Sequence, residues 1–304
     1  MTIASWKQMA VDLMNKGVSW RQIAKRLDVP RSTVSDYLRT VKQSLGARVL
    51  VLDIETAPAS AYHWRRWKEN IGQKQVISEG YIITWAAKWL GSEDVMFAKL
   101  PDFEDTFANS QADDSALVGQ LHALLEEADF VIAHNGRKFD LPTINARLLV
   151  NGYNPPHPYK IIDTLDIAKK AFKFPSNSLA SLAIYLGVEL RKLDTGGFDL
   201  WTDVIANKPQ AWADMMEYNI YDVLVLEQVY MKLRPWYTTH PAMQLLNSSD
   251  ILRCTCCGSH NVVPTGKFFY TSVSKFDTYA CGDCGKMNRG RVNKLDKAQR
   301  LVGV

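Results

Sequence analysis

The sequence predicts an α/β protein in which a mixed sheet is flanked by helices, with a small all-α module before it and a cysteine-rich module after it. Three observations lead to this prediction. Three strand-like apolar runs are followed by alternating helical and strand-like segments, which is typical of such a sheet. Three short amphipathic segments occupy the first 45 residues, and all five cysteines lie between positions 254 and 284.

Residues 1–45 predict three short helices and are expected to end in a hinge at residues 44–47. The first helix is expected to end at Gly17, Ser19 can cap the second, and Pro30 closes the turn before the third. The stretch "QIAKRLDVPRSTVSDYL" resembles the helix-turn-helix of bacterial regulators and recombinases, which implies a DNA-binding domain. The candidate DNA contacts are Arg31, Ser32, Thr33, Ser35, Asp36 and Arg39. A three-helix module that contacts protein is the alternative.

Residues 48–238 carry the predicted sheet. The run "RVLVLDIE" predicts a strand, and the following residues 80–100 predict a β-hairpin that turns near Gly91. A helix is expected over residues 115–127. Further strands are predicted in "DFVIAHN" and "KIIDTL", and further helices in "NSLASLAIYLG" and "PQAWADMMEYNIYDVLVLEQVYMKL".

Acidic residues stand at the ends of these elements. Asp53 and Glu55 share one face of their strand, because side chains alternate with period two. Asp140 directly follows another strand, where a helix begins, and Asp222 follows Tyr218 by four residues on one helix face. Like charges in an apolar strand are costly unless a cation neutralises them. Convergence of the four carboxylates on Mg²⁺ or Mn²⁺, which prefer oxygen ligands, accounts for their placement.

The ordered motifs D-x-E, H-N-x-x-x-F-D and Y-x-x-x-D resemble the DEDD superfamily of 3′→5′ exonucleases, in the branch whose last motif carries tyrosine. The stretches "AYHWRRW" and "YIITWAAKWLG" further resemble predicted exonucleases of phages. The resemblance covers nearly all of residues 48–238. It implies a ribonuclease H-like fold and hydrolysis of phosphodiester bonds by a two-metal mechanism.

The resemblance also implies a role for each motif residue. Asp53 is expected to bridge two Mg²⁺ or Mn²⁺ ions, and Tyr218 to orient the attacking water. The remaining metal ligands are Glu55, Asp140 and Asp222. The histidine branch of the family has histidine where Glu217 stands, so His134 is not the expected general base. Two further acids, Asp163 and Asp166, are candidates for supporting roles, and Thr56 and Asn135 are candidates for contacts with nucleic acid.

The cysteines form two C-x-x-C-G knuckles, made by Cys254, Cys257, Cys281 and Cys284. Gly258 and Gly285 let the backbone turn so that amides point at thiolate sulfur. Paired knuckles of this spacing predict one tetrahedral structural Zn²⁺, and the hairpin expected between them resembles a zinc ribbon over residues 250–292. Cys256 is a spare thiol that could replace a neighbour. Disulfides are the alternative, which an intracellular chain does not favour.

The net charge of +4 is unevenly distributed. Residues 1–48 carry nine Lys or Arg against three Asp or Glu, residues 251–304 also nine against three, and the residues between them 18 against 26. Basic ends around an acidic centre predict nucleic-acid-binding modules beside a cation-binding domain. The ribbon and the basic tail at residues 293–304 contain Lys286, Arg289, Arg291, Lys294, Lys297 and Arg300. Nearby aromatics suit single-stranded nucleic acid or form the module's core: Phe268, Phe269, Tyr270 and Phe276.

These features predict a metal-dependent 3′→5′ exonuclease acting on nucleic acid, with DNA favoured and RNA as the alternative substrate. A structure-specific endonuclease and a DNA-binding regulator with a vestigial nuclease domain are the competing hypotheses. No apolar run approaches the roughly 18 residues of a membrane-spanning helix. The N-terminus "MTIASWKQMA" lacks a signal-peptide pattern. The expected location is therefore the cytoplasm of a bacterial or phage-infected cell, without a membrane partner.

Overall fold

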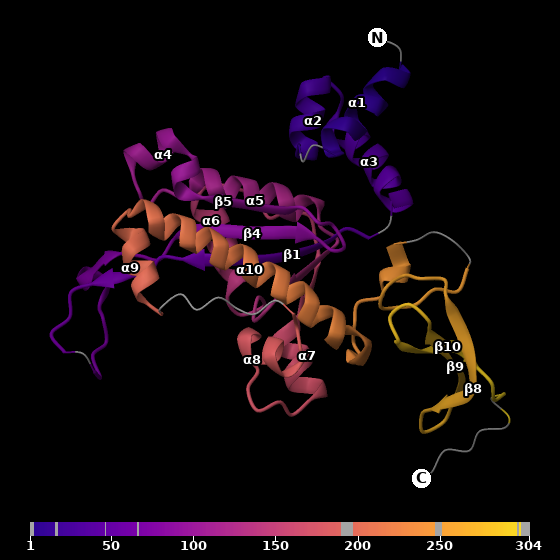
Figure 1. Cartoon of the computed structure of the whole chain (residues 1–304). Coiled ribbons are helices and arrows are strands. Elements are labelled where there is room, and N and C mark those ends of the chain that lie inside the picture. Colours follow the sequence, from indigo (N-terminus) through magenta and orange to yellow (C-terminus); the bar gives the residue numbers. More distant parts are fainter. Residues whose placement is uncertain are drawn as a thin grey trace.

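The structure is a computed structural model, and it describes residues 3–15, 18–45, 47–65, 67–189, 197–246, 251–296 and 298. A helical module, a mixed sheet between helices and a small antiparallel sheet follow one another along the chain (Figure 1). This architecture confirms the predicted fold class. Among the described residues, no helix combines the length and the apolarity needed to cross a membrane.

The N-terminal module consists of α1 (Ile3–Asn15), α2 (Trp20–Leu27) and α3 (Arg31–Leu45). Their shared core includes Ile23 and Val34. The Ser19 hydroxyl caps α2 as expected, by accepting a hydrogen bond from the backbone N–H of Gln22 (3.4 Å). The first helix is described as far as Asn15, and its predicted end at Gly17 lies outside the described residues. The first two residues of the expected hinge, 44 and 45, are helical instead, because α3 continues to Leu45.

Five strands form the central sheet in the order β5-β4-β1-β6-β7. They are β1 (Val49–Thr56), β4 (Ile82–Trp89), β5 (Val95–Lys99), β6 (Phe130–Ala133) and β7 (Lys160–Asp163). The first three pair antiparallel, whereas β1, β6 and β7 pair parallel, so the sheet is mixed as predicted. The β4–β5 hairpin turns at Gly91, whose φ of 83° suits glycine.

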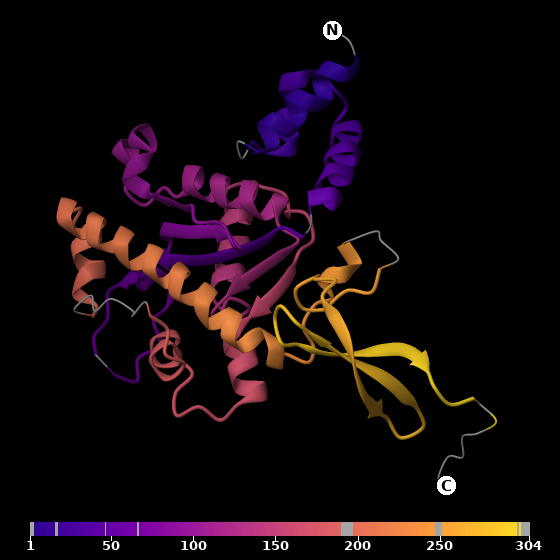
Figure 2. The same ribbon diagram turned by 45° about the vertical axis from the view of Figure 1, so that its right-hand side comes forward.

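Helices cover both faces of this sheet. One face contacts α5 (Ser115–Glu127) and α6 (Asp140–Val150), and the short α4 (Glu104–Asn109) lies nearby. The other face contacts α7 (Thr164–Ala171), α8 (Leu179–Tyr185) and the long α10 (Pro209–Leu233), while α9 (Asp199–Ile205) packs on the first half of α10. Figure 2 shows α10 running across the sheet.

The alternation of side chains along β1 decides where its acids project. Leu50, Leu52 and Ile54 belong to the core on the α5 side, whereas Val49 and Val51 belong to the core on the α10 side. Because side chains alternate, the residues at positions 53 and 55 continue the second row. The apolar α10-facing row of β1 therefore becomes acidic at its carboxyl end.

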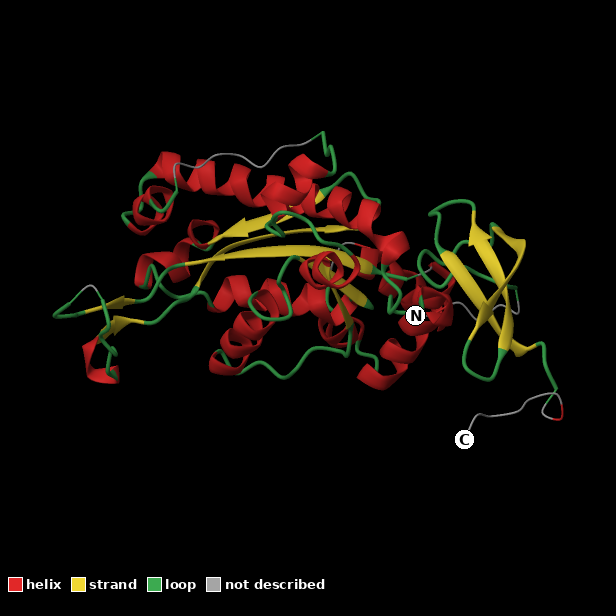
Figure 3. Ribbon diagram, turned by 90° about the horizontal axis from the view of Figure 1, so that it is seen from below, coloured by secondary structure: helices red, strands yellow, loops and turns green. Residues whose placement is uncertain are grey.

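Two strands interrupt the expected order. Between β1 and β4, β2 (Ser60–Ala61) and β3 (Val76–Ser78) form a small two-stranded ribbon, which the sequence did not predict. This arm, residues 57–81, projects from the body on the side away from the C-terminal sheet (Figures 1 and 3). The C-terminal sheet has the order β10-β9-β8 and consists of β8 (Val262–Tyr270), β9 (Lys275–Cys281) and β10 (Met287–Asn293).

Candidate functional site

Three acidic side chains meet where β1 passes α10. Asp53, Glu55 and Asp222 each place one carboxylate oxygen so that the three atoms lie within 4.8 Å of one another. Asp222 is buried, and the two strand residues are half-buried. Carboxylates held this close repel one another unless a cation lies between them. This donor set of oxygen atoms from acidic side chains fits a hard divalent cation such as Mg²⁺ or Mn²⁺.

Tyr218 lies one turn before Asp222 on the same face of α10, near the acidic cluster. Its side chain is 7% exposed and packs edge-on against Trp201 of α9, with ring centroids 5.8 Å apart. Burial, and then the negative charges of Asp222, Glu55 and Asp53, raise the pKa of Tyr218 well above its ordinary value. The phenol therefore keeps its proton and acts as a hydrogen-bond donor at the acidic cluster.

Asn219, which the sequence analysis missed, holds one of the acids in place. Its Nδ2 donates a hydrogen bond to Asp53 Oδ2 at 2.7 Å, and the Thr84 hydroxyl donates to Asn219 Oδ1 at 3.1 Å. Both Asn219 and Thr84 are fully buried. The sequence spacing could have identified this residue, because Asn219 precedes Asp222 by three positions and therefore lies on the same helix face.

Asp140 is the first residue of α6, so a helix begins there as expected. It does not directly follow β6, since residues 134–139 intervene, and it lies outside the three-acid group. Strand β6 pairs with β1 only over Val49–Val51, and beyond that point Asp140 Oδ1 accepts the backbone N–H of Ile54 at 3.3 Å. Burial raises the pKa of Asp140 to about 7, and the nearby charge of Asp163 contributes. Asp140 thus supports the β1 backbone between the two strand acids.

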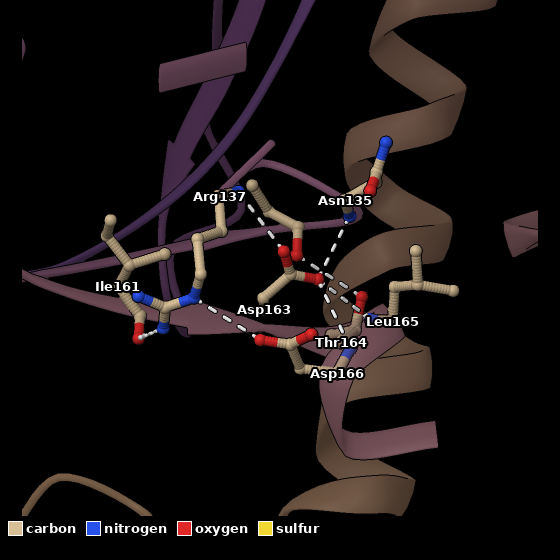
Figure 4. Close-up of polar contacts among 8 residues, drawn as sticks. Asn135, Arg137, Ile161, Asp163, Thr164, Leu165 and Asp166 are labelled. Carbon is tan, nitrogen blue, oxygen red and sulfur yellow. Dashed lines mark hydrogen bonds and ion pairs between the residues drawn. The ribbon is translucent and has the colours of Figure 1, made fainter. Parts of the chain in front are cut away.

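Asp163 organises the loop that follows β6. Its carboxylate accepts hydrogen bonds from the backbone N–H groups of Asn135 (3.0 Å) and Arg137 (3.1 Å), and it also caps α7 through the N–H of Leu165 (3.0 Å) (Figure 4). Asp166 forms an ion pair with Arg137. The expected supporting roles of these two acids therefore correspond to a structural network.

The remaining candidates lie around this loop and the end of β1. His134 forms a hydrogen bond through Nδ1 with the Thr164 hydroxyl (2.9 Å) and is not a member of the three-acid group. Asn135 has a φ of 64°, a left-handed conformation that asparagine tolerates better than most residues. Thr56 is half-buried at the last position of β1. The roles of Asn135 and Thr56 in substrate binding stay predictions.

Four cysteine sulfurs meet at the C-terminal sheet. The Sγ atoms of Cys254, Cys257, Cys281 and Cys284 lie within 4.8 Å of one another. The Sγ atoms of Cys254 and Cys284 are 3.6 Å apart, as are those of Cys257 and Cys281, which is near the separation of thiolates around one Zn²⁺ and too long for a disulfide. Gly258 and Gly285 have φ values of 73° and 74°, as the knuckles require. Cys256 lies outside the group, and its Sγ faces the carbonyl oxygen of Arg234 (3.7 Å).

The basic side chains of the ribbon differ in exposure, since one is buried and two others lie over aromatic rings. Lys286 is buried and donates to the carbonyl oxygen of Tyr237 (2.8 Å), so it joins the ribbon to the chain after α10 and is not available to a partner. Lys275 lies over the Phe268 ring at 3.8 Å. Arg289 lies over Phe276 at 4.5 Å. Phe268, Phe269 and Tyr270 are exposed and therefore do not form a core. Lys297 and Arg300 lie outside the described residues.

The candidate DNA contacts of the first module lie on α3. Arg31, Ser32, Thr33 and Asp36 are exposed, and Ser35 is half-buried. The side chain of Arg39 lies outside the described part of the chain. An exposed polar row at the start of the third helix is the arrangement that a recognition helix needs to reach base edges or phosphates.

Two family models match parts of the chain. Residues 88–234 match the RNase_H superfamily model, which includes Asp140, Tyr218 and Asp222 but begins after β1. Residues 4–48 match a homeodomain-like domain. Among solved structures, the family B DNA polymerase from the hyperthermophilic archaeon Pyrobaculum calidifontis is similar over 67% of this chain, at 17% identity and a TM-score of 0.43. The chain spans about 27% of the length of that polymerase. A search of curated proteins gave no match.

Proposed function

Because the chain contains an RNase H-like domain and a homeodomain-like domain, we propose that it hydrolyses phosphodiester bonds of nucleic acid, as a metal-dependent 3′→5′ exonuclease with DNA as the favoured substrate. The observation that carries this proposal is the meeting of Asp53, Glu55 and Asp222 within 4.8 Å, beside a protonated tyrosine. Polar groups placed so closely in a partly buried site are typical of a functional centre.

These three acids would hold two Mg²⁺ or Mn²⁺ ions, with Asp140 as the predicted fourth ligand. When bound, such ions provide Lewis-acid stabilisation on both sides of a phosphodiester. The chain's own groups would position the reactants. Asn219 fixes the orientation of Asp53, Asp140 fixes the strand backbone, and the Tyr218 hydroxyl donates a hydrogen bond that can orient the attacking water.

A cleavage assay on end-labelled strands tests this proposal. With Mg²⁺ or Mn²⁺, a 5′-labelled single strand should give a ladder that shortens from the 3′ end, and a blocked 3′ end should stop it. Labelled DNA and RNA of the same sequence decide the preferred substrate. Cleavage of circular strands would instead support the endonuclease, and the absence of any cleavage at either metal would support the DNA-binding regulator.

Replacing Tyr218 by phenylalanine should slow cleavage by roughly 10²-fold or more, the usual cost of one lost hydrogen bond to the transition state. Metal binding should persist, because the phenol is not assigned as a ligand. Single-turnover rates and the metal-dependent shift in unfolding temperature measure the two effects separately. Tyr221→Phe is the matched control on the same helix, and its rate should stay near the parental value. A Tyr218→Phe protein as active as the parent would remove the tyrosine from the mechanism.

The N-terminal module is proposed to bind duplex DNA through α3. Replacing Arg31 by alanine should weaken duplex binding and reduce its salt dependence by about one unit of log–log slope if the guanidinium contacts a phosphate. Cleavage of short single strands should be unchanged. Titrations at several salt concentrations measure this, with Lys232→Ala, an exposed cation at the end of α10, as the control. Equal binding and slope for Arg31→Ala would favour the protein-contacting alternative.

A further inference from the structure

The arm between β1 and β4 carries large aromatic side chains that the fold does not bury. Tyr62, Trp64 and Trp67 are 74%, 92% and 82% exposed. Tryptophan is on average a highly buried residue, so two such side chains in one short segment need an explanation outside the core. Exposed apolar side chains that gather in this way mark surfaces for binding a partner.

The base of the arm is held by backbone hydrogen bonds. Ser60 pairs with Ser78 and Ala61 with Val76 in the short ribbon. The backbone N–H of Ala57 donates to the carbonyl oxygen of Tyr81 at 2.9 Å, which closes the arm where it leaves the sheet. The attachment of the arm to the body therefore does not depend on its aromatic rings.

The tip of the arm is shaped by one carboxylate. Glu69 Oε2 accepts hydrogen bonds from the backbone N–H groups of Trp64 (2.9 Å) and Arg65 (2.6 Å). Gln75 Nε2 donates to Glu69 Oε1 (3.3 Å) and to the carbonyl oxygen of Tyr62 (3.1 Å). The backbone hydrogen bonds lower the pKa of Glu69, so it stays ionised in this role. Polar contacts thus fix the backbone that presents the tryptophans to solvent.

The charge of the arm differs from that of its surroundings. Residues 57–81 carry four Lys or Arg against two Asp or Glu, within a region, residues 49–250, that carries 18 against 26. Arg65 directly follows Trp64 and Lys68 directly follows Trp67, and both cations are exposed. Aromatic rings interleaved with cations suit a polyanion that also offers flat rings, which is single-stranded nucleic acid.

The arm is also close in sequence to the candidate site. It begins directly after β1, whose last residues include Glu55. Trp64 follows Glu55 by nine positions, and a chain of this length spans at most about 30 Å. A strand bound at the acidic cluster can therefore extend to the arm within several nucleotides.

We infer that the arm binds unpaired bases of the nucleic acid strand by stacking on Tyr62, Trp64 and Trp67, while Arg65 and Lys68 contact its phosphates. This inference deepens the proposed function, on which it rests, and it assigns single-stranded nucleic acid as the ligand of this surface. Each stacked ring is expected to contribute roughly tenfold or more to the affinity.

Binding of a fluorescently labelled single strand of about 16 nucleotides tests the inference, with the full chain in buffer that contains EDTA. Trp64→Ala combined with Trp67→Ala should weaken binding by at least about a hundredfold, since two stacked rings are lost. The Trp64→Phe and Trp67→Phe pair should retain most of the affinity, because phenylalanine also stacks. Ile77→Ala is the matched control, since Ile77 is 59% exposed on the same arm but cannot stack. Equal unfolding temperatures verify that the variants are folded.

A strand of the same length with abasic positions shows whether bases are the contacted groups. The parent should bind the abasic strand more weakly than the ordinary strand, and this difference should be much smaller for the double alanine variant, which keeps only Tyr62. The inference would be overturned if the double alanine variant lost affinity for both strands by the same factor, or if its affinity were unchanged. It would also be overturned if the parent were a dimer that the variant converts to a monomer. This binding test does not depend on hydrolysis. If the strand bound as expected but was not cleaved in the presence of metal, the proposed nuclease activity would be refuted and the inferred stacking surface would still hold.

Discussion

Replacing Asp53 by asparagine is expected to abolish cleavage without unfolding the protein. The loss in rate should be at least roughly 10²- to 10³-fold, the range found when a preorganised transition-state contact is removed. The substitution keeps the shape of the side chain, and an asparagine oxygen can still accept the hydrogen bond from Asn219 Nδ2, which is 2.7 Å from Asp53 Oδ2. It removes one negative charge from the group that also contains Glu55 and Asp222.

The same substitution should have opposite effects on stability with and without metal. In EDTA the variant should unfold at the same or a higher temperature than the parent, because repulsion among the three carboxylates is reduced. With Mn²⁺ the parent should gain about 2.7 kcal/mol at 100 times Kd, and the variant much less. Calorimetry under both conditions measures this.

Glu217→Gln is the control for Asp53→Asn, since it removes an exposed acid next to Tyr218 and should change neither rate nor metal response. A turnover of Asp53→Asn within a few-fold of the parent, at equal metal concentration, would refute the assignment of the acidic cluster as the catalytic centre.

Replacing Cys254 and Cys281 together by serine is expected to unfold the C-terminal sheet. Each knuckle loses one of its two thiolates, and structural zinc can supply on the order of 10 kcal/mol of folding free energy to so small a module. Elemental analysis should find one zinc per parental chain and none in the variant. Limited proteolysis should then remove residues after about position 250, while the central sheet stays protected.

Cys256→Ser separates the zinc ligands from the spare thiol. Cys256 is also buried, but it lies outside the four-sulfur group, and its Sγ donates toward the Arg234 carbonyl. This variant should keep one zinc per chain and an unfolding temperature near that of the parent. A parental protein purified without zinc, or zinc retained by the double serine variant, would contradict the four-cysteine site.

Local sequence patterns determined most elements of this protein. The apolar run before Asp53 predicted β1, and Gly91 predicted the turn of the following hairpin. The spacing of the cysteines predicted the two knuckles with positive φ at Gly258 and Gly285. These features depend on side-chain alternation, glycine conformation and short loops, which a few neighbouring residues decide.

The arm was not predicted, because local patterns describe it poorly. Its strands have two and three residues, and its shape depends on hydrogen bonds of the Glu69 and Gln75 side chains. Alternation of hydrophobic and polar residues cannot be recognised over so few positions. The aromatic residues of the arm were visible in the sequence, but their exposure was not.

The membership of the acidic cluster was decided by tertiary structure. Sequence motifs identified Asp53, Glu55, Asp140 and Asp222, but only three of these carboxylates lie together. The pairing of β6 with β1 ends at Val51, so the backbone N–H of Ile54 donates to Asp140 instead of to a strand. The relative lengths of neighbouring strands decide this contact. Likewise, Asn219 meets Asp53 across 166 positions of sequence because α10 crosses the end of β1. Sequence spacing specifies which face of an element a side chain occupies, whereas the packing of elements specifies which faces meet.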